Sequence, residues 1–474
     1  VASTTIGAAH LTFRSISANG ATNGVILNTT GASGGLKVVG NGGTCSSPGT
    51  CTGGAIQNAA VGVSLTSTTG VAIDRMLIQN TTSHGVGGTQ VNGFSFTNGF
   101  VDNSGTALGA EASNIAFNTT AAGTETNLSG VVTITGNTLT NAYYHGVDIF
   151  NFNGTITDAT ISGNTITSST STATSKGTGI RFIAFGSATT IANVTKATLA
   201  NNVVSNFPSA AGIMAQGGNG NAGGPAGVFG TAGSGTNVIA ITGNRVAGNS
   251  AANRIGTQAI IAVVNGRGQG NFDISTNGTV GNPITNVVGT AIAVSSFGLA
   301  NVTANVANNV VVANNAVGAQ GIGAGTSQTF GATDTPSLTV TISNNTISQT
   351  DGNGILVTAR DATATVRAKI QNNTVAAPLG GVRPGIRVDA GNGVSVDDSI
   401  CLNISGNTSA GSGGSQGLGL RKQGTVSTTN DFGVNGMGAT STPGVEAYVD
   451  GLNPGGNGTL LISATSGFSN CSLP

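Results

Sequence analysis

Apolar and small polar residues follow one another along this chain in a short pattern that returns many times. Its clearest copy is Ile161-Ser-Gly-Asn-Thr-Ile166, which runs apolar, small, Gly or Asn, Asn, any residue, apolar. Copies recur at intervals of about thirty residues with insertions of varied length, and Ile274-Ser-Thr-Asn277 is a degenerate copy. A period of this length predicts a solenoid in which each repeat forms one coil.

Each copy predicts a strand, a tight corner and a second strand. The apolar residues on either side of the corner can point into one core. The corner itself needs a residue that tolerates a positive φ, and Gly and Asn do so at the lowest cost. Side-chain amides that stack from coil to coil can hydrogen-bond to each other and to the backbone. The pattern therefore predicts a ladder of asparagines along one corner, formed by Asn137, Asn164, Asn202, Asn244, Asn309, Asn345 and Asn373.

A second signal lies downstream of each corner, where a glycine opens an apolar alternation. Examples are Gly146-Val-Asp-Ile149, Gly179-Ile-Arg-Phe182 and Gly385-Ile-Arg-Val388. The two strand types keep one order, and no helical stretch lies between them to cover a sheet. Each strand must therefore pair with its equivalent one coil along, which predicts an all-β parallel β-helix of roughly ten to thirteen coils.

The repeat predicts one continuous domain with three regions. Residues 1–130 hold irregular coils, residues 131–422 form the regular body, and the rhythm stops in residues 423–474. We expect this last region to be an irregular tail that folds over the final coils as a cap, with a short helical turn at Val445–Val449.

Composition narrows the functional classes. Charged residues are only 7 % of the chain and the net charge is zero, so neither nucleic acid nor an anionic membrane surface is an expected partner. No apolar run is long enough to span a membrane. The four cysteines form no CxxC pair, which favours disulfides over metal ligation and secretion over the cytosol.

Chain order suggests how the cysteines pair. Cys45 and Cys51 enclose a short Ser-Ser-Pro-Gly-Thr loop, and Cys401 with Cys471 would tie the tail to the last regular coil. This connectivity is the only one of three that avoids a link across most of the rod.

The Ile-Ser-Gly-Asn-Thr-Ile coils resemble the right-handed parallel β-helix (pectate-lyase-like) superfamily of pectate lyases, polygalacturonases, phage tailspikes and autotransporter-type passenger domains. They are most similar to bacterial secreted β-helix repeat proteins. The resemblance covers about residues 20–420 and implies a right-handed coil. It implies little about activity, because enzymes, adhesins and inert stalks share this solenoid.

The densest candidate chemistry lies around Asp148 and Arg181, which align one coil apart, with Tyr144 and His145 nearby. A pectate-lyase-like site would use several carboxylates for Ca²⁺ and an Arg or Lys base. The simpler interpretation is a surface ion pair on one face of the solenoid, worth about 0–1 kcal/mol, and we expect this rather than a catalytic set. We also expect no cofactor and no metal centre.

Other features weigh against carbohydrate chemistry. The adjacent acids Asp397 and Asp398 have no matching acid on neighbouring coils, and polygalacturonase-like motifs are absent. The chain has no Trp and three Tyr, whereas sugar clefts favour aromatic platforms. Phe152, Phe185 and Phe297 share a position relative to the glycine-started strands and are expected to stack inside the core.

These observations favour an extracellular or cell-surface structural protein: a rigid rod that serves as a fibre subunit, stalk or adhesin. We expect it to associate end to end with copies of itself or to continue into a longer chain. Two other functions stay open. One is a polysaccharide lyase or hydrolase that acts through Tyr144, His145, Asp148 and Arg181, and the other is a surface module that binds a glycan.

Overall fold

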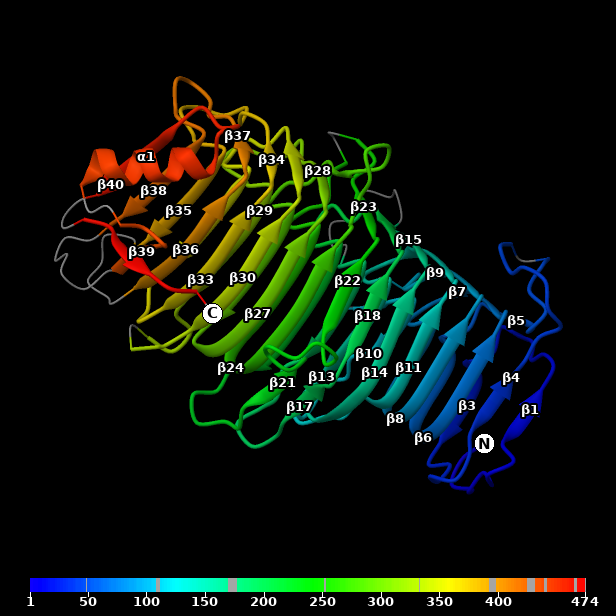
Figure 1. Cartoon of the computed structure of the whole chain (residues 1–474). Helices are drawn as coiled ribbons and strands as arrows, with labels where there is room; N and C mark the ends of the chain where they lie inside the picture. Colours follow the sequence, from blue (N-terminus) through cyan, green and yellow to red (C-terminus); the bar gives the residue numbers. More distant parts are fainter. Residues whose placement is uncertain are drawn as a thin grey trace.

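The computed structural model of the chain is an elongated all-β solenoid (Figure 1). It describes residues 1–47, 49–107, 111–168, 177–250, 253–331, 333–391, 398–423, 431–438, 441–463 and 467–473. Every pairing between its named strands is parallel, and each strand pairs with strands of the neighbouring coils. The predicted parallel β-helix is confirmed.

Each coil has three faces, which follow one another along the chain. The strands of the first face are β3 (Asn23–Asn28), the first half of β6 (Val61–Asp74), the first half of β8 (Val86–Thr97), β10 (Ile115–Phe117), β13 (Val147–Asn151), β16 (Ile180–Ala184), β20 (Ile213–Asn219), the first half of β24 (Ile260–Ser275), β26 (Ile292–Phe297), β29 (Ile322–Ser327), β32 (Ile355–Ala359), β35 (Ile386–Ala390), β38 (Leu418–Lys422) and β40 (Thr459–Ser463).

The second face follows after a bend. Its strands are β1 (Leu11–Phe13), β4 (Leu36–Val38), the second halves of β6, β8 and β24, β11 (Leu128–Thr135), β14 (Gly154–Ser162), β17 (Ala192–Val194), β18 (Ala197–Ala200), β21 (Gly227–Phe229), β22 (Ile239–Thr242), β27 (Leu299–Ala307), β30 (Ser337–Ser343), β33 (Thr365–Gln371), β36 (Ser399–Ser405), β39 (Asp431–Asn435) and β41 (Ser469–Cys471). Because β6, β8 and β24 run across the bend, these two faces form one 28-stranded sheet.

The third face is a separate sheet of 13 strands, one from each successive coil. Its strands are β2 (Ala18–Asn19), β5 (Ala55–Gln57), β7 (Leu77–Thr81), β9 (Phe100–Ser104), β12 (Thr138–Ala142), β15 (Thr165–Ser168), β19 (Val203–Ser205), β23 (Arg245–Ala247), β25 (Ile284–Thr285), β28 (Val310–Val312), β31 (Thr346–Ser348), β34 (Thr374–Val375) and β37 (Thr408–Ser409).

The core is the space enclosed by the three faces, filled by the inward-pointing residue of each alternation. Phenylalanines stack through it from coil to coil, as in Phe182, Phe229 and Phe272, whose ring centroids are 5.7 and 5.8 Å apart. The expectation for Phe152, Phe185 and Phe297 is wrong, because all three are only half-buried and lie outside the core cluster. Phe297 is five residues after the inward-pointing Ile292, and an odd offset turns a strand residue outward.

The C-terminal region is more regular than its sequence predicts. Strand β39 pairs with β36, β40 pairs with β38, and β41 pairs with β39, so two faces of the solenoid continue into it. On the third face, helix α1 (Thr442–Leu452) follows β37 at the end of the solenoid opposite to the first coils (Figure 1). Val445 and Val449, where a short helical turn is predicted, are fully buried against the core.

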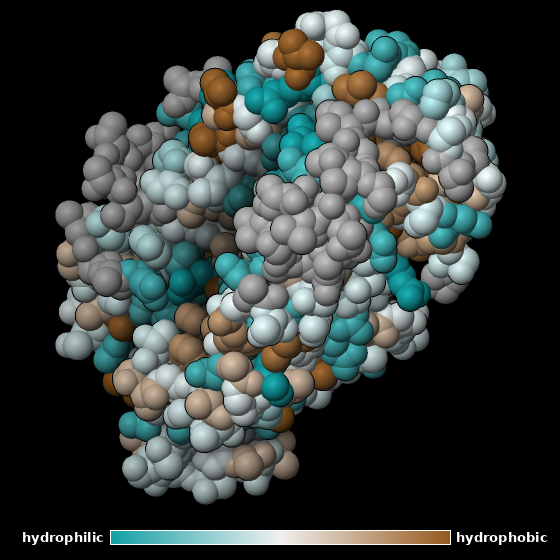
Figure 2. Space-filling view, turned by 90° about the vertical axis from the view of Figure 1, so that its left-hand side faces the viewer, coloured by the Kyte–Doolittle hydropathy of each residue, from teal (hydrophilic) through white to brown (hydrophobic). Residues whose placement is uncertain are grey.

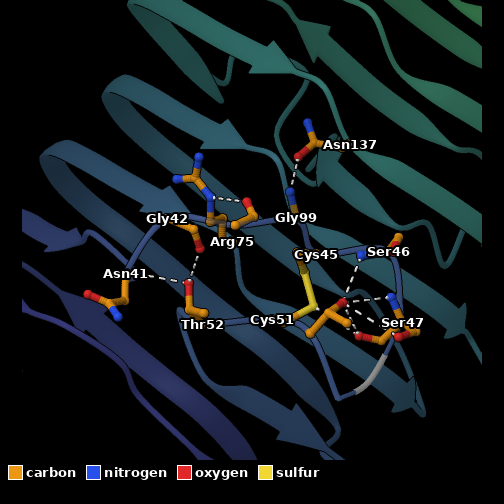
Figure 3. The surroundings of a disulfide bond; sticks show 12 residues. Asn41, Gly42, Cys45, Ser46, Ser47, Cys51, Thr52, Arg75, Gly99 and Asn137 are labelled. Atoms are coloured by element: carbon orange, nitrogen blue, oxygen red, sulfur yellow. Dashed lines mark hydrogen bonds between the residues drawn. A yellow bond between two sulfur atoms is a disulfide. The ribbon is translucent and has the colours of Figure 1, made fainter.

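Both predicted disulfides are present. Cys45 and Cys51 close a loop that precedes β5, and Figure 3 shows how the surrounding hydroxyls hold this loop. Thr50 Oγ1, for example, accepts hydrogen bonds from the backbone N–H groups of Ser46 and Ser47 at 3.1 and 3.2 Å. The second disulfide joins Cys401 on β36 to Cys471 on β41.

Candidate functional site

The seven predicted ladder asparagines are buried in register at the corner between the second and third faces. At each step, the backbone N–H and the side-chain Nδ2–H of one asparagine both donate to the Oδ1 of the next, at 2.9–3.1 Å. Nδ2 also donates to a backbone carbonyl of the preceding coil at 2.8–2.9 Å. Each amide therefore has partners for its oxygen and for both of its hydrogens.

The ladder is longer than the predicted set. Asn277, from the degenerate copy, and Asn407 continue it with the same bonds, and Asn453, directly after α1, closes it. At its other end the N–H of Gly99 donates to Asn137 Oδ1 at 2.7 Å. Ten consecutive asparagines thus link coils from β12 to the C-terminal helix.

The residue before each ladder asparagine explains why the third position of the repeat is Gly or Asn. Gly136, Gly163, Asn201, Gly243 and Asn308 all have φ between +54° and +67°. Residues other than Gly and Asn rarely adopt this backbone conformation. Thr276, before Asn277, has φ +56° and is the exception within the repeat, and Leu452, before Asn453, is the last residue of α1.

The structure also brings Asp148 and Arg181 together. They are direct partners of the β13–β16 pairing, and Arg181 donates from Nε to Oδ1 at 2.6 Å and from an η nitrogen to Oδ2 at 2.7 Å. Asp148 is fully buried and the Arg181 side chain is 14 % exposed. The expectation of a surface ion pair is wrong, because neighbouring side chains cover the carboxylate completely.

Two of the neighbours were not predicted. Asn118 Nδ2 donates to Asp148 Oδ2 at 2.7 Å, and Glu111 Oε2 accepts from Arg181 at 3.3 Å. Asp148 and Glu111 therefore share one guanidinium group, which also lies 5.4 Å from the centroid of the Phe150 ring. Burial opposes the charge on Arg181, but its hydrogen bond to Asp148 raises the pKa of the guanidinium.

His145 is held neutral in this cluster. Burial, together with Arg181 and against the attraction of Asp148, lowers the pKa of His145 to about 4. Its Nδ1 accepts from the backbone N–H of Thr178 at 2.8 Å, so the ring proton is on Nε2, 3.7 Å from Asp148 Oδ2. The ring of Tyr144 packs edge-on against His145 with centroids 4.5 Å apart. The Asp148 carboxylate already accepts hydrogen bonds from Arg181 and Asn118. A neutral imidazole beside it is a poor general acid at neutral pH.

The other two histidines have the same structural role as His145. Nδ1 of His10 accepts from the N–H of Gly35 at 3.0 Å, and Nδ1 of His84 accepts from the N–H of Ser113 at 3.2 Å. Burial lowers the pKa of His84 despite the charge of Asp148. Each histidine thus ties one coil to the backbone of the next.

A second charged cluster, which sequence reasoning missed, surrounds Asp389 on β35. This fully buried carboxylate accepts hydrogen bonds from Arg360 at 2.6 Å, from Arg387 at 2.9 Å and from Arg421 at 2.6 and 3.1 Å. The three arginines come from three successive coils. The only signal of this cluster in the sequence is that Asp389 and Arg421 stand at the same position of their strands. The two residues are direct partners in the pairing of β35 with β38.

Other candidate features give no further site. Asp398 is buried, and Asp397 lies outside the described residues. Within the described ranges, no group of three or more His, Cys, Asp and Glu side chains is placed to hold a metal ion. No helix in that part of the chain has the length and apolar character needed to cross a membrane.

Comparison of the chain with protein-family models, with curated proteins and with solved structures finds no match. Its class is therefore defined by the fold alone, as an all-β parallel solenoid stapled by two disulfides.

Proposed function

We propose that the chain is a rigid structural module of an extracellular or cell-surface protein, acting as a fibre subunit, stalk or adhesin. The observation that carries this proposal is the uninterrupted ladder of ten buried asparagines. Bending the rod or sliding one coil over the next would break several ladder hydrogen bonds at once. A protein whose role is to keep its shape under load benefits from such a device.

One further observation supports a location outside the cell. The disulfides Cys45–Cys51 and Cys401–Cys471 fit an oxidising compartment. The face shown in Figure 2 carries scattered small hydrophobic groups rather than one apolar patch, as suits a surface exposed to water. The repeat resemblance adds the expectation of a right-handed coil of the pectate-lyase-like superfamily.

End-to-end association is part of the proposal. In the described chain, β1 and β2 each pair with a single named strand, β4 and β5, so the first coil presents strand edges that can pair with another chain. Phe13 and Ile26, on these first coils, are 46 % and 45 % exposed. The partner is either a second copy, docked head to tail, or the continuation of a longer chain. A head-to-tail contact between copies can propagate as a filament.

Electron microscopy of the full chain over a range of concentrations tests this function. We expect straight particles of uniform width that lengthen by stacking as the concentration rises. Replacing Phe13 with Lys places a charge on β1 of the first coil and should keep the particles single. Wild-type particles that stay single at the highest concentration would contradict self-association, and visibly bent particles would contradict rigidity.

One observation favours an enzyme as a second candidate function. Glu111 supplies the second carboxylate that a polysaccharide lyase or hydrolase around Asp148 and Arg181 would need. Glu111 is the exposed member of this pair, at 41 % of its side chain. Assay of the chain against a panel of neutral and acidic polysaccharides tests this reading. Cleavage that is lost in Glu111→Gln would replace the structural function with the enzymatic one.

A further inference from the structure

The arginine cluster around Asp389 carries more positive charge than its structural role requires. Among the described residues, one carboxylate neutralises one of the three guanidinium groups, and counting Asp361, which follows Arg360 in the chain, still leaves an excess of one. A staple between coils would need only the Arg421–Asp389 pair, which is already bidentate. On a chain with 7 % charged residues, such a local excess indicates recognition of an anion.

An unsatisfied donor points the same way. Arg360 uses one η nitrogen to bind Asp389, but its Nε is buried and has no hydrogen-bond partner among the described residues. Buried polar groups of native proteins almost always have a partner, and a charged donor without one is costly. The guanidinium groups can still be reached from solvent, because the side chains of Arg360 and Arg387 are 32 % and 23 % exposed.

A hollow of about 210 Å³ lies beside the cluster on the first face. Its floor is strand β29, where Gly323 and Gly325 have no side chains and leave the backbone exposed. Phe297 also lines the hollow. A Cβ on Gly325 would lie 2.3 Å from Thr358 Oγ1, so a larger residue there would have to displace this hydroxyl. The hollow is thus lined by an aromatic ring, a flat floor and hydroxyl groups.

The sheet register connects the hollow to the arginines. Leu356 and Thr358 line the hollow from β32, and on β35 they pair with Arg387 and Asp389 respectively. One strand spacing, about 4.8 Å, therefore separates the hollow from the cluster. A ligand that occupies the hollow would have its edge at the guanidinium groups.

We propose that this part of the first face binds a small ring that carries a carboxylate. Arg360 and Arg387 receive the carboxylate, since the planar guanidinium matches it with two parallel hydrogen bonds. The ring lies over the floor of β29 and against Phe297, where apolar and aromatic surfaces favour a flat partner. Asp389 is a positioning residue that holds the arginines in place before the ligand arrives.

Calorimetric titration of the full chain at low ionic strength tests the site. The probes are two acids, glucuronate and benzoate, and their neutral counterparts, glucose and benzyl alcohol. We expect at least one acid to bind at least tenfold more tightly than its neutral counterpart, and the preferred acid tells a sugar acid from an aromatic acid. If neither acid binds more tightly than its neutral counterpart, the proposal is wrong.

Three variants locate the binding. Arg387→Gln leaves Asp389 with its other two arginines, and it should weaken the preferred acid by about 10- to 100-fold, the value of a charge-assisted hydrogen bond. Gly323→Val should block the hollow while leaving the charges unchanged. Lys196→Gln removes an equal charge at a half-exposed site on another face and should change the affinity less than twofold. Wild-type affinity in both site variants, or an equal loss in the Lys196 control, would overturn the assignment.

Discussion

Replacing one asparagine in the middle of the ladder measures what the ladder contributes. In Asn244→Ala, the Oδ1 that accepts from Asn202 N and Nδ2 is lost, both at 3.0 Å. The donations of Nδ2 to Leu199 O at 2.8 Å and to Asn277 Oδ1 at 3.0 Å are lost as well. Each of these bonds is worth about 1 kcal/mol net, so we expect the free energy of unfolding to fall by about 4 kcal/mol.

The assay is urea denaturation followed by far-UV circular dichroism, with the unfolding rate compared if refolding is incomplete. The matched control is Asn301→Ala, an exposed asparagine on β27 with no side-chain hydrogen bond in the described structure. That change should cost less than about 0.5 kcal/mol. Equal stability of the two variants would refute the reasoning, because it would mean that the buried amides contribute nothing beyond filling space.

Three further changes test other parts of the structure. Thr276→Asn should raise the free energy of unfolding by about 1 kcal/mol in the same urea assay, because it relieves a positive φ that Thr adopts poorly; a loss of stability would contradict this. Arg181→Ala should lower the free energy of unfolding by about 3–5 kcal/mol, because it leaves Asp148 buried without its arginine. This loss should exceed that of the Asp148→Ala/Arg181→Ala double variant, and additive losses from the two single changes would argue against a buried pair. Because the pKa of His145 is about 4 when folded and 6.5 in the unfolded chain, its contribution is complete above pH 6.5 and is lost as the pH falls through 4. As the pH is lowered from 8 to 3, the melting temperature should therefore fall less in His145→Gln than in the wild type. Parallel plots of melting temperature against pH for the two proteins would contradict the depressed pKa.

The regular part of the fold could be predicted because the solenoid repeats a local rule. Asn164 and Asn202 follow the same corner, and their stacking needs only a parallel coil of constant geometry. The same rule predicts the pairing of Asp148 with Arg181, since both stand at one position of the glycine-started strands. Periodic signals thus determine which residues become neighbours across coils.

Residues outside the repeat could not be predicted, because loops of varied length carry no register. Glu111 and Arg360 reach the charged clusters from segments beyond the strand alternation. Asn453 joins the ladder from the end of a helix, where no copy of the repeat exists. Burial of Asp148 also escaped prediction, because it depends on Asn118 and other side chains brought in by such segments.

Single-molecule pulling on the full chain, held near its two ends, tests the central claim of a rigid, load-bearing rod most directly. We expect stepwise unfolding at high force, with steps of about thirty residues that each release roughly 100 Å of chain. Asn244→Ala should lower the force of the steps around its coil. Extension at low force without steps would show that the ladder does not make the solenoid a mechanical element.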